Sequence, residues 1–284
     1  MSELIRLKEK LGTIGKIHQM TEAMQIIAVT QLKQVQSRQK AAQHYKKHYD
    51  RMARRLNIRL KRRSGRIEPK NLIYVFGSDR GFCGSFNEKL VARAAEVAKT
   101  QQAAGFDVDL AVLGRRGQSI AAEFDLPNLR PINPVNKVID FGQISGMALE
   151  AYRAYFQGRV NQVYLLYNEF KTMLFQSPSL VSLLPFDRPE AGTEDQMLIV
   201  EPSLSAVRQY VVLNYIKVLF YDAFLQTRLG EVGARLMTMR NATENSKELI
   251  KELRIKYNKA RQSMITVELS EILSSFEILN EGAD

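Results

Sequence analysis

The chain of 284 residues contains no tryptophan and a single cysteine, Cys83. One cysteine cannot form an intrachain disulfide or a cysteine-based zinc site, so we expect a fold held by packing in a reducing compartment. Aromatic residues make up only 8% of the chain, which disfavours a binding groove built from aromatic side chains. The hydrophobic content of 45% is nevertheless enough for a sizeable core.

Long apolar runs are also missing from the sequence. Nowhere do 18 apolar residues follow one another, so we expect no membrane-spanning helix. Residues 1–10 lack the apolar centre of a secretory signal. Any role at a membrane is therefore expected to depend on a partner.

Proline is absent from both ends of the chain. All eight prolines lie between Pro69 and Pro202. Because proline breaks helix interiors, this distribution predicts long terminal helices around a globular centre. We expect an N-terminal helix at residues 1–66, a central α/β domain at 67–202 and a C-terminal helix at 203–284.

Heptad spacing in the C-terminal segment supports this division. Steps of four and three continue over about six heptads, as is typical of a coiled-coil seam. Only Thr243 and Ser246 are polar members of the series. The alternative is one amphipathic helix lying on a globular body. The seam consists of Leu225, Leu229, Val232, Leu236, Met239, Thr243, Ser246, Ile250, Leu253, Tyr257, Ala260, Met264 and Val267.

The N-terminal segment carries a similar apolar stripe. Its helix would be roughly 80 Å long, and the C-terminal helix roughly 110 Å. Two helices that leave one globular body should pair antiparallel, and the longer one should stand alone from about Ala260. The stripe consists of Leu4, Leu7, Leu11, Ile14, Ile17, Met20, Met24 and Ile27 and, after a stutter, Leu32, Val35, Ala42, Tyr45, Tyr49, Met52 and Leu56.

The centre of the chain alternates between strand and helix patterns. Such alternation predicts a mainly parallel sheet. The expected strands are Leu72–Phe76, Val108–Leu113 and Val163–Tyr167, and the expected helices cover about 88–103, a short segment from Gly114 onward, and 140–156.

Three further features concern the connections. The proline-rich stretch 127–134 is interpreted as a loop, and residues 187–196 as a mobile loop. Ser203 is a candidate N-cap for the last helix, because a serine hydroxyl can accept a hydrogen bond from the first turn.

A glycine-rich segment, Gly77–Asn87, follows a predicted strand and precedes a helix, which is where phosphate-binding loops occur. It lacks both the Gly-Lys-Ser/Thr of a nucleoside-triphosphate loop and the spacing of a dinucleotide fingerprint. We therefore interpret it as a turn that sets strand-to-helix geometry. We predict no cofactor.

Catalytic and metal-binding residue types are sparse. Cys83 could act as a nucleophile, but the three histidines, His18, His44 and His48, all lie in the predicted N-terminal helix. His44 and His48 have the i, i+4 spacing of metal ligands, yet no third ligand accompanies them. We predict neither a catalytic residue nor a metal site.

Positive charge is concentrated in one stretch. The chain carries a formal net charge of +11, and residues 33–66 contain thirteen Lys or Arg against one acid, Asp50. Such a block suits nucleic acid, an anionic membrane surface or an acidic protein face. Tyr45 and Tyr49 lie on the apolar stripe, so we assign them to packing rather than to base stacking.

Three segments carry recognisable motifs: Ile14–Met24 (IGKIHQMTEAM), Ser78–Asn87 (SDRGFCGSFN), and Glu231–Asn245 (EVGARLMTMRNATEN) continued by Tyr257–Ile272 (YNKARQSMITVELSEI). They resemble segments of the γ subunits of F-type ATP synthases. The first resembles the opening helix of that family, and the second its Ser/Thr-Asp-Arg-Gly-Leu-Cys-Gly turn. The third gives the strongest match and lies in the predicted C-terminal helix.

The resemblance implies an α/β fold with long helices, in which an antiparallel coiled coil of both termini stands on a Rossmann-like α/β domain. It further implies a non-catalytic central stalk, or rotor shaft. Its partners would be the α and β subunits of an α3β3 hexamer, the ε subunit and the c-ring, with no nucleic acid and no membrane insertion. The location implied is peripheral, at the cytoplasmic face of the bacterial inner membrane.

Family roles carry over to five matching positions. Met24 corresponds to a residue that passes the acidic lever of the β subunit. Arg235 and Gln262 correspond to residues that hydrogen-bond a β-subunit loop, and Thr266 and Glu268 to contacts near the tip. The sequence departs from the family at Glu22, where lysine is common, at Ser85, which replaces a glycine, and at Ser274, Ser275 and Phe276, where small residues are usual.

Two functions of other classes remain open from the residues alone. One is a coiled-coil adapter that binds nucleic acid, which the charge would suit. The other is a nucleotide-using enzyme built on the central domain. Specific, steeply salt-dependent binding of duplex DNA would favour the first, and tight nucleotide binding by the isolated chain the second.

Overall fold

A computed structural model describes residues 2–58, 67–124, 126–132, 140–173, 175–186 and 200–281, with side chains from residue 3 to 274. It divides into two compact units. One, the two-helix unit, contains Met1–Ile27 and Leu236–Asp284, and the other, the sheet unit, contains Ala28–Arg235. The predicted mobile loop at 187–196 lies outside the described residues.

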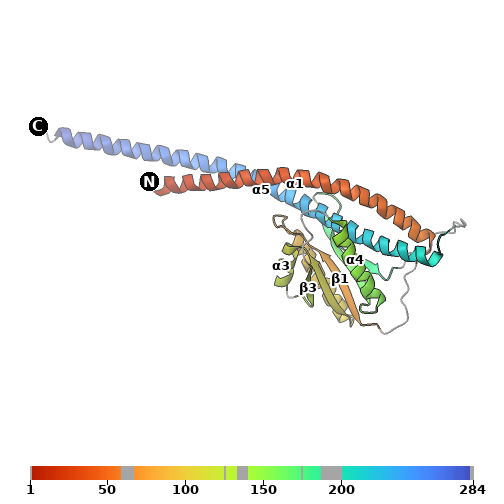
Figure 1. The fold of residues 1–284 in the computed structure, drawn as a ribbon. Helices are drawn as coiled ribbons and strands as arrows, with labels where there is room; N and C mark the ends of the chain where they lie inside the picture. The colour runs from red at the N-terminus through yellow and green to blue at the C-terminus, as the bar shows by residue number, and fades with distance from the viewer. Residues whose placement is uncertain are drawn as a thin grey trace. The chain divides into compact units, whose positions relative to one another are not determined.

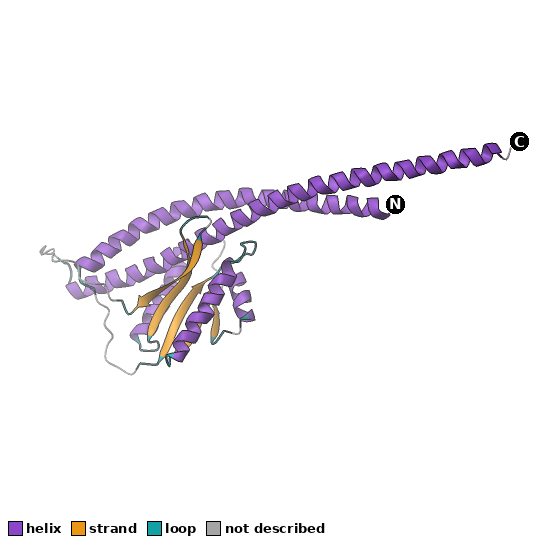
Figure 2. Ribbon diagram, turned by 180° about the vertical axis from the view of Figure 1, so that it is seen from behind, coloured by secondary structure: helices purple, strands orange, loops and turns teal. Residues whose placement is uncertain are grey.

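The sheet unit is built on five strands in the order β3-β2-β1-β4-β5 (Figures 1 and 2). Strands β1 to β4 are parallel to their neighbours, and β5 pairs antiparallel with β4. This order places β1 in the centre, as in doubly wound α/β folds. The strands are β1 (Lys70–Phe76), β2 (Asp107–Leu113), β3 (Leu129–Ile132), β4 (Gln162–Phe170) and β5 (Gln176–Leu184).

Alternate residues of β1 serve two different cores. Leu72, Tyr74 and Phe76 join a cluster formed with α4 (Phe141–Phe156), α5 and the end of α1. Ile73 and Val75 join a second cluster formed with α2 (Phe86–Ala103) and α3 (Arg115–Glu123). Because helices cover both faces, a central strand must be apolar throughout, which explains its continuous apolar run.

The predicted mainly parallel sheet is confirmed, and two details are corrected. Residues 127–134 are not wholly a loop, because β3 lies within them and pairs with β2. The antiparallel strand β5 was not predicted. Its sequence contains Pro178 and three serines, and such a strand is tolerated because it lies at the edge of the sheet.

The two terminal helices are long, as proline distribution predicted. Helix α1 covers Ser2–Arg55 and α5 covers Leu204–Glu281. The Ser203 hydroxyl accepts a hydrogen bond from the backbone N–H of Ala206 at 3.3 Å, which confirms the predicted N-cap. Within the two-helix unit the helices run side by side in opposite directions (Figure 1). Thr21 accordingly meets Thr243, and Leu4 meets Tyr257 further toward the C-terminus.

The C-terminal seam is confirmed as far as Met264, beyond which Val267 is 52% exposed. The unpaired part of α5 therefore begins about one turn later than the predicted start at Ala260. The N-terminal stripe needs more correction. A series of buried or half-buried positions along α1 keeps a strict spacing of four and three residues. The predicted stripe departs from this spacing at five residues that point outward and are exposed: Ile17, Met20, Ile27, Tyr45 and Met52.

Polar side chains occupy seam positions that the apolar stripe had passed over. His18 Nδ1 lies 3.0 Å from Ser246 Oγ, and the hydroxyls of Thr21 and Thr243 lie 2.9 Å apart. Thr21 is 4% exposed and Ser246 is 7% exposed. Thr243 and Ser246 were predicted as polar members of the C-terminal seam, but the N-terminal stripe missed His18 and Thr21, because a search for hydrophobic residues shifts by one position wherever a seam residue is polar.

Candidate functional site: the helical tip and the loop at Arg235

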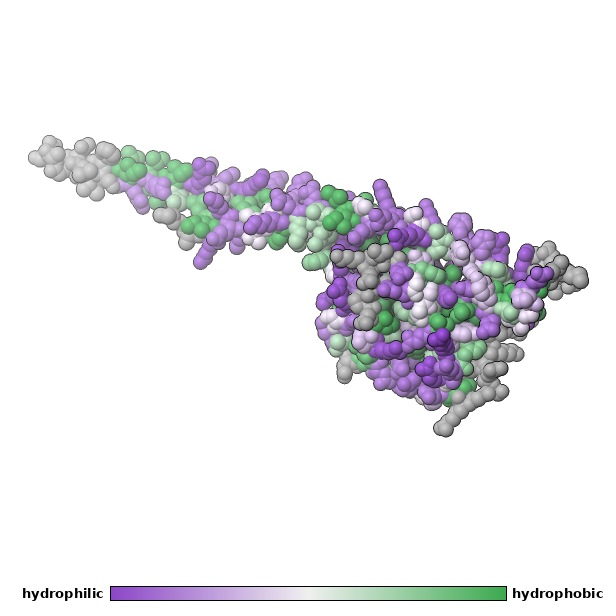
Figure 3. Space-filling model, viewed as in Figure 1, coloured by the Kyte–Doolittle hydropathy of each residue, from purple (hydrophilic) through white to green (hydrophobic). Residues whose placement is uncertain are grey.

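The tip of the two-helix unit exposes a series of large apolar side chains. Figure 3 shows hydrophobic residues on the surface of α5 up to the last described side chains. Exposed apolar surface of this kind marks an interaction site. The residues are Ile265, Val267, Leu269, Ile272 and Leu273, each between 43% and 65% exposed.

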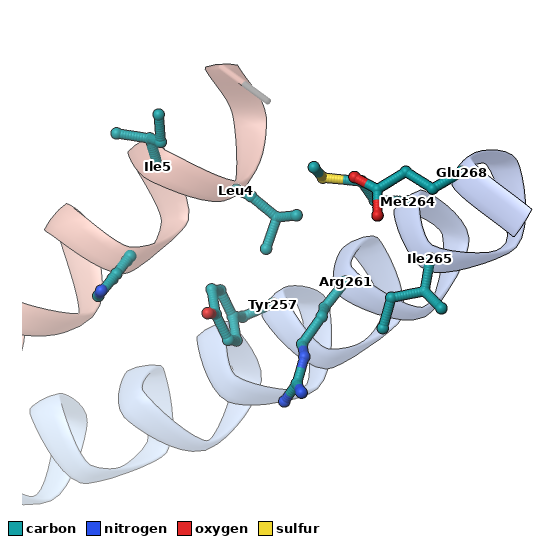
Figure 4. Close-up of a pocket in the computed structure, with 8 residues that line it drawn as sticks. Leu4, Ile5, Tyr257, Arg261, Met264, Ile265 and Glu268 are labelled. Atoms are coloured by element: carbon teal, nitrogen blue, oxygen red, sulfur yellow. The ribbon is translucent and has the colours of Figure 1, made fainter. Parts of the chain in front are cut away.

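A groove of about 330 Å³ opens where α1 begins beside α5. Figure 4 shows Leu4 directed into the gap between the helices, toward Tyr257, with Met264 further along α5. Arg261 and Glu268 contribute charged groups to the lining. The groove is therefore apolar at its base and charged at its rim, as protein interfaces commonly are.

Three of the five predicted contact residues share this exposed tip. Gln262, Thr266 and Glu268 are all exposed, and the Thr266 hydroxyl donates to the Gln262 carbonyl at 3.0 Å. Met24 is half-buried on α1 and lies outside the groove lining. The structure thus brings together the residues near the C-terminus, and it leaves Met24 at a separate place.

Arg235 has a different environment, inside the sheet unit. It is 9% exposed, and its guanidinium lies 2.7 Å from Glu231 Oε1. It also donates to the carbonyl oxygens of Gly81 at 3.3 Å and Arg80 at 3.5 Å. Arg235 therefore holds the glycine-rich turn of its own chain, and its role in contacting a partner stays a prediction.

Glu231 is the functional residue that the sequence interpretation missed. It is completely buried, and its second oxygen lies 2.6 Å from Arg228 Nη1. The carboxylate thus bridges two guanidinium groups, which compensates the cost of burying its charge. The signal was present in the sequence, as an acid with arginines three residues before it and four residues after it on an otherwise apolar helix.

The glycine-rich turn itself has the wrong polarity for an anion. Its carbonyl groups at Arg80 and Gly81 face a guanidinium, whereas a phosphate loop presents N–H groups. A Cβ at Gly77 would lie 2.9 Å from the Gly117 backbone, so glycine is required by close approach to α3. The geometry favours the interpretation as a structural turn.

Cys83 lies within this turn and is 4% exposed. Burial raises the pKa of its thiol, with an opposing contribution from the Ser78 hydroxyl at 3.8 Å. A thiol that is protonated and buried is a poor nucleophile. All three histidines lie on α1, so no imidazole of the sheet's loops can activate it.

The described residues offer neither a metal site nor a membrane-spanning helix. Among the described residues, no group of three His, Cys, Asp or Glu side chains could hold a metal ion. His48 Nδ1 lies 3.2 Å from the Arg51 guanidinium, which disfavours a cation beside it. No helix within the described ranges has the length and apolarity needed to cross a bilayer.

The predicted basic stretch is only partly described, because residues 59–66 are outside the described ranges. Within α1, Arg54 and Arg55 are exposed, whereas Lys46 turns toward α5 and lies 2.5 Å from Asp222. Tyr45 is 63% exposed, so its assignment to packing was wrong. Tyr49 is half-buried beside it, with ring centroids 5.9 Å apart.

Solved structures of similar fold are rotors and central stalks. The structure titled OSCP/F1/c-ring of the Euglena gracilis mitochondrial ATP synthase has a TM-score of 0.70 at 16% identity, covering 100% of this chain and 96% of that one. The rotor of the same enzyme has a TM-score of 0.65 at 16% identity over 93% and 99%. The Tetrahymena thermophila central stalk and c-ring structure has a TM-score of 0.55 at 22% identity over 78% and 99%.

Sequence comparisons give the same result. The ATP synthase family matches residues 3–279. The ATP synthase γ chain of Erythrobacter litoralis is 31% identical, covering 98% of this chain and all of its own length. That of Chloroflexus aurantiacus is 29% identical over 94% and 96%. The resemblance inferred from three sequence segments is thereby confirmed: the chain belongs to the ATP synthase γ-chain family and has the fold of the central stalk.

Proposed function

We propose that this chain is the rotating shaft that couples ion-driven rotation of a c-ring to conformational change at the catalytic sites of an α3β3 hexamer. The observation that carries the proposal is the tip of α5. It continues as a single helix beyond Met264 and exposes apolar residues such as Val267 and Leu273. Helices in proteins gain most of their stability from packing, so exposed apolar residues on a lone helix favour a surrounding partner.

The shaft itself would perform no chemistry. The single thiol is buried with a raised pKa, and the glycine-rich turn directs carbonyl groups to Arg235. ATP chemistry would belong to the α and β subunits. The nucleic-acid adapter and the nucleotide-using enzyme lose support, because the basic helix and the α/β sheet are both accounted for by membership of the γ-chain family.

Rotation would act through differences in contact. An asymmetric shaft presents a different face to each of three catalytic sites, and each face favours one conformation. A contact can shift the conformational equilibrium of a catalytic site only by the difference between its binding free energies for the two conformations. Inverting a 1:99 population needs a difference of about 5.5 kcal/mol. Turning the shaft would move this bias from one site to the next.

The tip residues Gln262, Thr266 and Glu268 are exposed and available for contacts with the hexamer, and Met24 would contribute a further contact. Arg235 is mostly buried, so a contact with a β subunit would involve only its exposed edge. The sheet unit would bind the ε subunit and the c-ring, and the exposed basic residues of α1 would face acidic or polar surfaces of the β subunit, the ε subunit or the c-ring. The domain boundaries at residues 66 and 202 stay predictions.

The location proposed is peripheral, at the cytoplasmic face of the bacterial inner membrane. Purification from native membranes tests the whole proposal. We expect one copy of this chain with three α and three β subunits, and ATP-dependent ion pumping that is lost when the chain is removed. Isolation of the chain without those subunits would contradict it.

Charge reversal tests the role of the basic helix. Arg54→Glu with Arg55→Glu should weaken assembly with ε or the c-ring, and more strongly at low salt because exposed charges are screened at high salt. Arg59, a further arginine of the basic stretch 33–66, lies outside the described residues. Unchanged assembly and coupling would show that these charges face solvent.

A further inference from the structure

Two parts of the sheet unit hold α5 from different sides, just before the helix passes into the two-helix unit. On one side is the glycine-rich turn, residues 77–84. On the other side are Phe170, Met173 and Gln176, at the adjoining ends of β4 and β5. We call these residues the collar. Nothing in the proposed function requires the sheet to grip the shaft at this point, so the contact calls for an explanation of its own.

The first side of the collar is polar. Arg235 donates to the carbonyls of Gly81 and Arg80, while Glu231 accepts from Arg235 and Arg228. Glu231 is 0% exposed. The short bonds to Glu231 lie within α5 and orient Arg235, while the bonds from Arg235 to Gly81 and Arg80, at 3.3 Å and 3.5 Å, join α5 to the turn and oppose rotation of the helix about its own axis.

The second side is a seat made by two glycines. A Cβ added at Gly233 would lie 3.2 Å from Phe170 Cε2, and one at Gly230 would lie 3.3 Å from Gln176 Oε1 and 2.9 Å from Cε2 of Phe86, the first residue of α2. The backbone of α5 therefore contacts the aromatic rings directly. The Phe170 N–H also donates to Gln226 Oε1 at 3.2 Å, which ties the end of β4 to the same helix.

The collar is in turn anchored to the sheet. The Ser78 N–H donates to Asn87 Oδ1 at 2.9 Å, and Asn87 Nδ2 donates to Ser78 Oγ at 2.7 Å. Asn168 on β4 donates to the Phe86 carbonyl at 3.1 Å. These side chains are buried, so the turn, α2 and β4 form one stiff support.

The residues of α5 that contact the collar lie on two different sides of the helix. At 3.6 residues per turn, the pair Glu231 and Arg235 lies roughly 150° around the helix from the pair Gly230 and Gly233. A single contact would let the helix pivot. Contacts on nearly opposite sides resist both twisting and sliding.

We propose that the collar is a torsional lock, in which Glu231 and Arg235 are positioning residues that make the sheet unit and α5 turn as one body. The proposal rests on the shaft function proposed above. Without the lock, torque applied to the sheet unit would be lost partly in twisting α5 before it reached the helical tip. The ion pair thus acts on coupling without contacting nucleotide or ion.

The first experiment uses the isolated chain and needs no rotation. Cys83 lies in the collar and is the only cysteine, so its alkylation by iodoacetamide reports opening of the turn. We expect Glu231→Gln to raise the rate about tenfold or more, because the loss of the negative charge weakens the bond that orients Arg235 toward the turn carbonyls. The matched control is Glu96→Gln, which breaks the exposed Arg93–Glu96 pair. This pair has the same i, i+3 spacing and the same 2.6 Å distance as Arg228–Glu231, and its loss should change the rate less than about twofold.

The second experiment uses the complete ATP synthase in membrane vesicles and measures ions pumped per ATP hydrolysed. We expect Glu231→Gln to lower this ratio while hydrolysis itself continues, and Glu96→Gln to leave it unchanged. If Glu231→Gln does not assemble, Arg235→Lys decides, because lysine keeps the charge but lacks the planar guanidinium that donates to Gly81 through both Nε and Nη2.

The outcomes separate the two proposals. If the wild-type chain assembles but supports no coupled pumping, the shaft function fails. If the wild-type complex pumps and the variant has a faster Cys83 reaction but an unchanged pumping ratio, the torsional lock is overturned. An unchanged Cys83 rate in Glu231→Gln and Arg235→Lys would also overturn it, since the ion pair would then not hold the turn.

Discussion

The same two helices behave differently in the two units of the molecule. In the sheet unit, α5 buries large side chains completely, among them Tyr215, Phe220 and Leu225. In the two-helix unit, α5 buries only isolated residues of the seam, such as Met239 and Leu253. A continuous helix is therefore not uniformly stabilised, because stability comes from what each turn packs against.

Buried polar groups differ in the same way. The sheet unit buries a charged carboxylate, Glu231, between two guanidinium groups. The two-helix unit buries the hydroxyls of Thr21 and Ser246 beside His18. The buried charge is tolerated because both of its partners, Arg228 and Arg235, lie one turn away on the same helix, whereas the two-helix seam carries smaller, uncharged polar groups.

The largest effect should come from removing a ring in the core of the sheet unit. Phe220 is fully buried, edge-to-face with Tyr74 at 4.9 Å between ring centroids. Phe220→Ala should lower the free energy of unfolding by about 3–5 kcal/mol, through lost burial and the cavity left behind. Urea unfolding followed by circular dichroism would measure it. Phe175→Ala, at a 71% exposed position, is the control and should change stability by less than about 0.5 kcal/mol.

One substitution should have opposite signs in the two units. Gly230→Ala places a methyl group against Phe86 and should destabilise the sheet unit by about 1–3 kcal/mol. Gly12→Ala, on α1 of the two-helix unit, meets nothing within 4 Å and should stabilise by about 0.5–1 kcal/mol, because alanine restricts the unfolded chain. Thermal unfolding of both variants tests this contrast. Stability changes of the same sign in both variants would contradict it.

The polar layer of the two-helix unit should show pairwise coupling. Thr21→Val alone should cost about 1 kcal/mol, since it removes a partner from Thr243. Thr21→Val combined with Thr243→Val should be close to neutral, because both hydroxyls are replaced by groups of similar shape. A double-mutant cycle from thermal melts gives the coupling energy. Additive effects would mean that the two hydroxyls act independently.

The smallest effect concerns a tyrosine of the sheet unit at high pH. Burial, and then the charge of Asp222, raises the pKa of Tyr167 to about 12. Because the folded pKa exceeds the unfolded value of about 10, the stability that Tyr167 contributes is present below pH 10 and is lost as the pH rises toward 12. Ultraviolet difference titration should show a step near pH 12 that Tyr167→Phe removes. A step nearer pH 10 would show that the ring is hydrated.

Much of the architecture was predictable from local patterns. Proline distribution indicated both long helices, and four-three spacing located the C-terminal seam as far as Met264. Continuous apolar runs indicated β1 and β2, since strands covered on both faces must be apolar throughout. The edge strands β3 and β5 were not predicted, because an edge strand needs no long apolar run and can contain proline.

The candidate site likewise contains features that the sequence predicted and features that it did not. The exposed tip residues Gln262, Thr266 and Glu268 were assigned by resemblance to a family, and periodicity alone could not have distinguished them from other surface positions. The partner of Arg235 was hidden, because Gly81 is 154 residues away in the sequence. By itself, the sequence determined where helices and central strands form, since these depend on neighbours within a few turns. Only the tertiary structure decided which polar groups meet inside, because burial makes the pairing of distant residues obligatory.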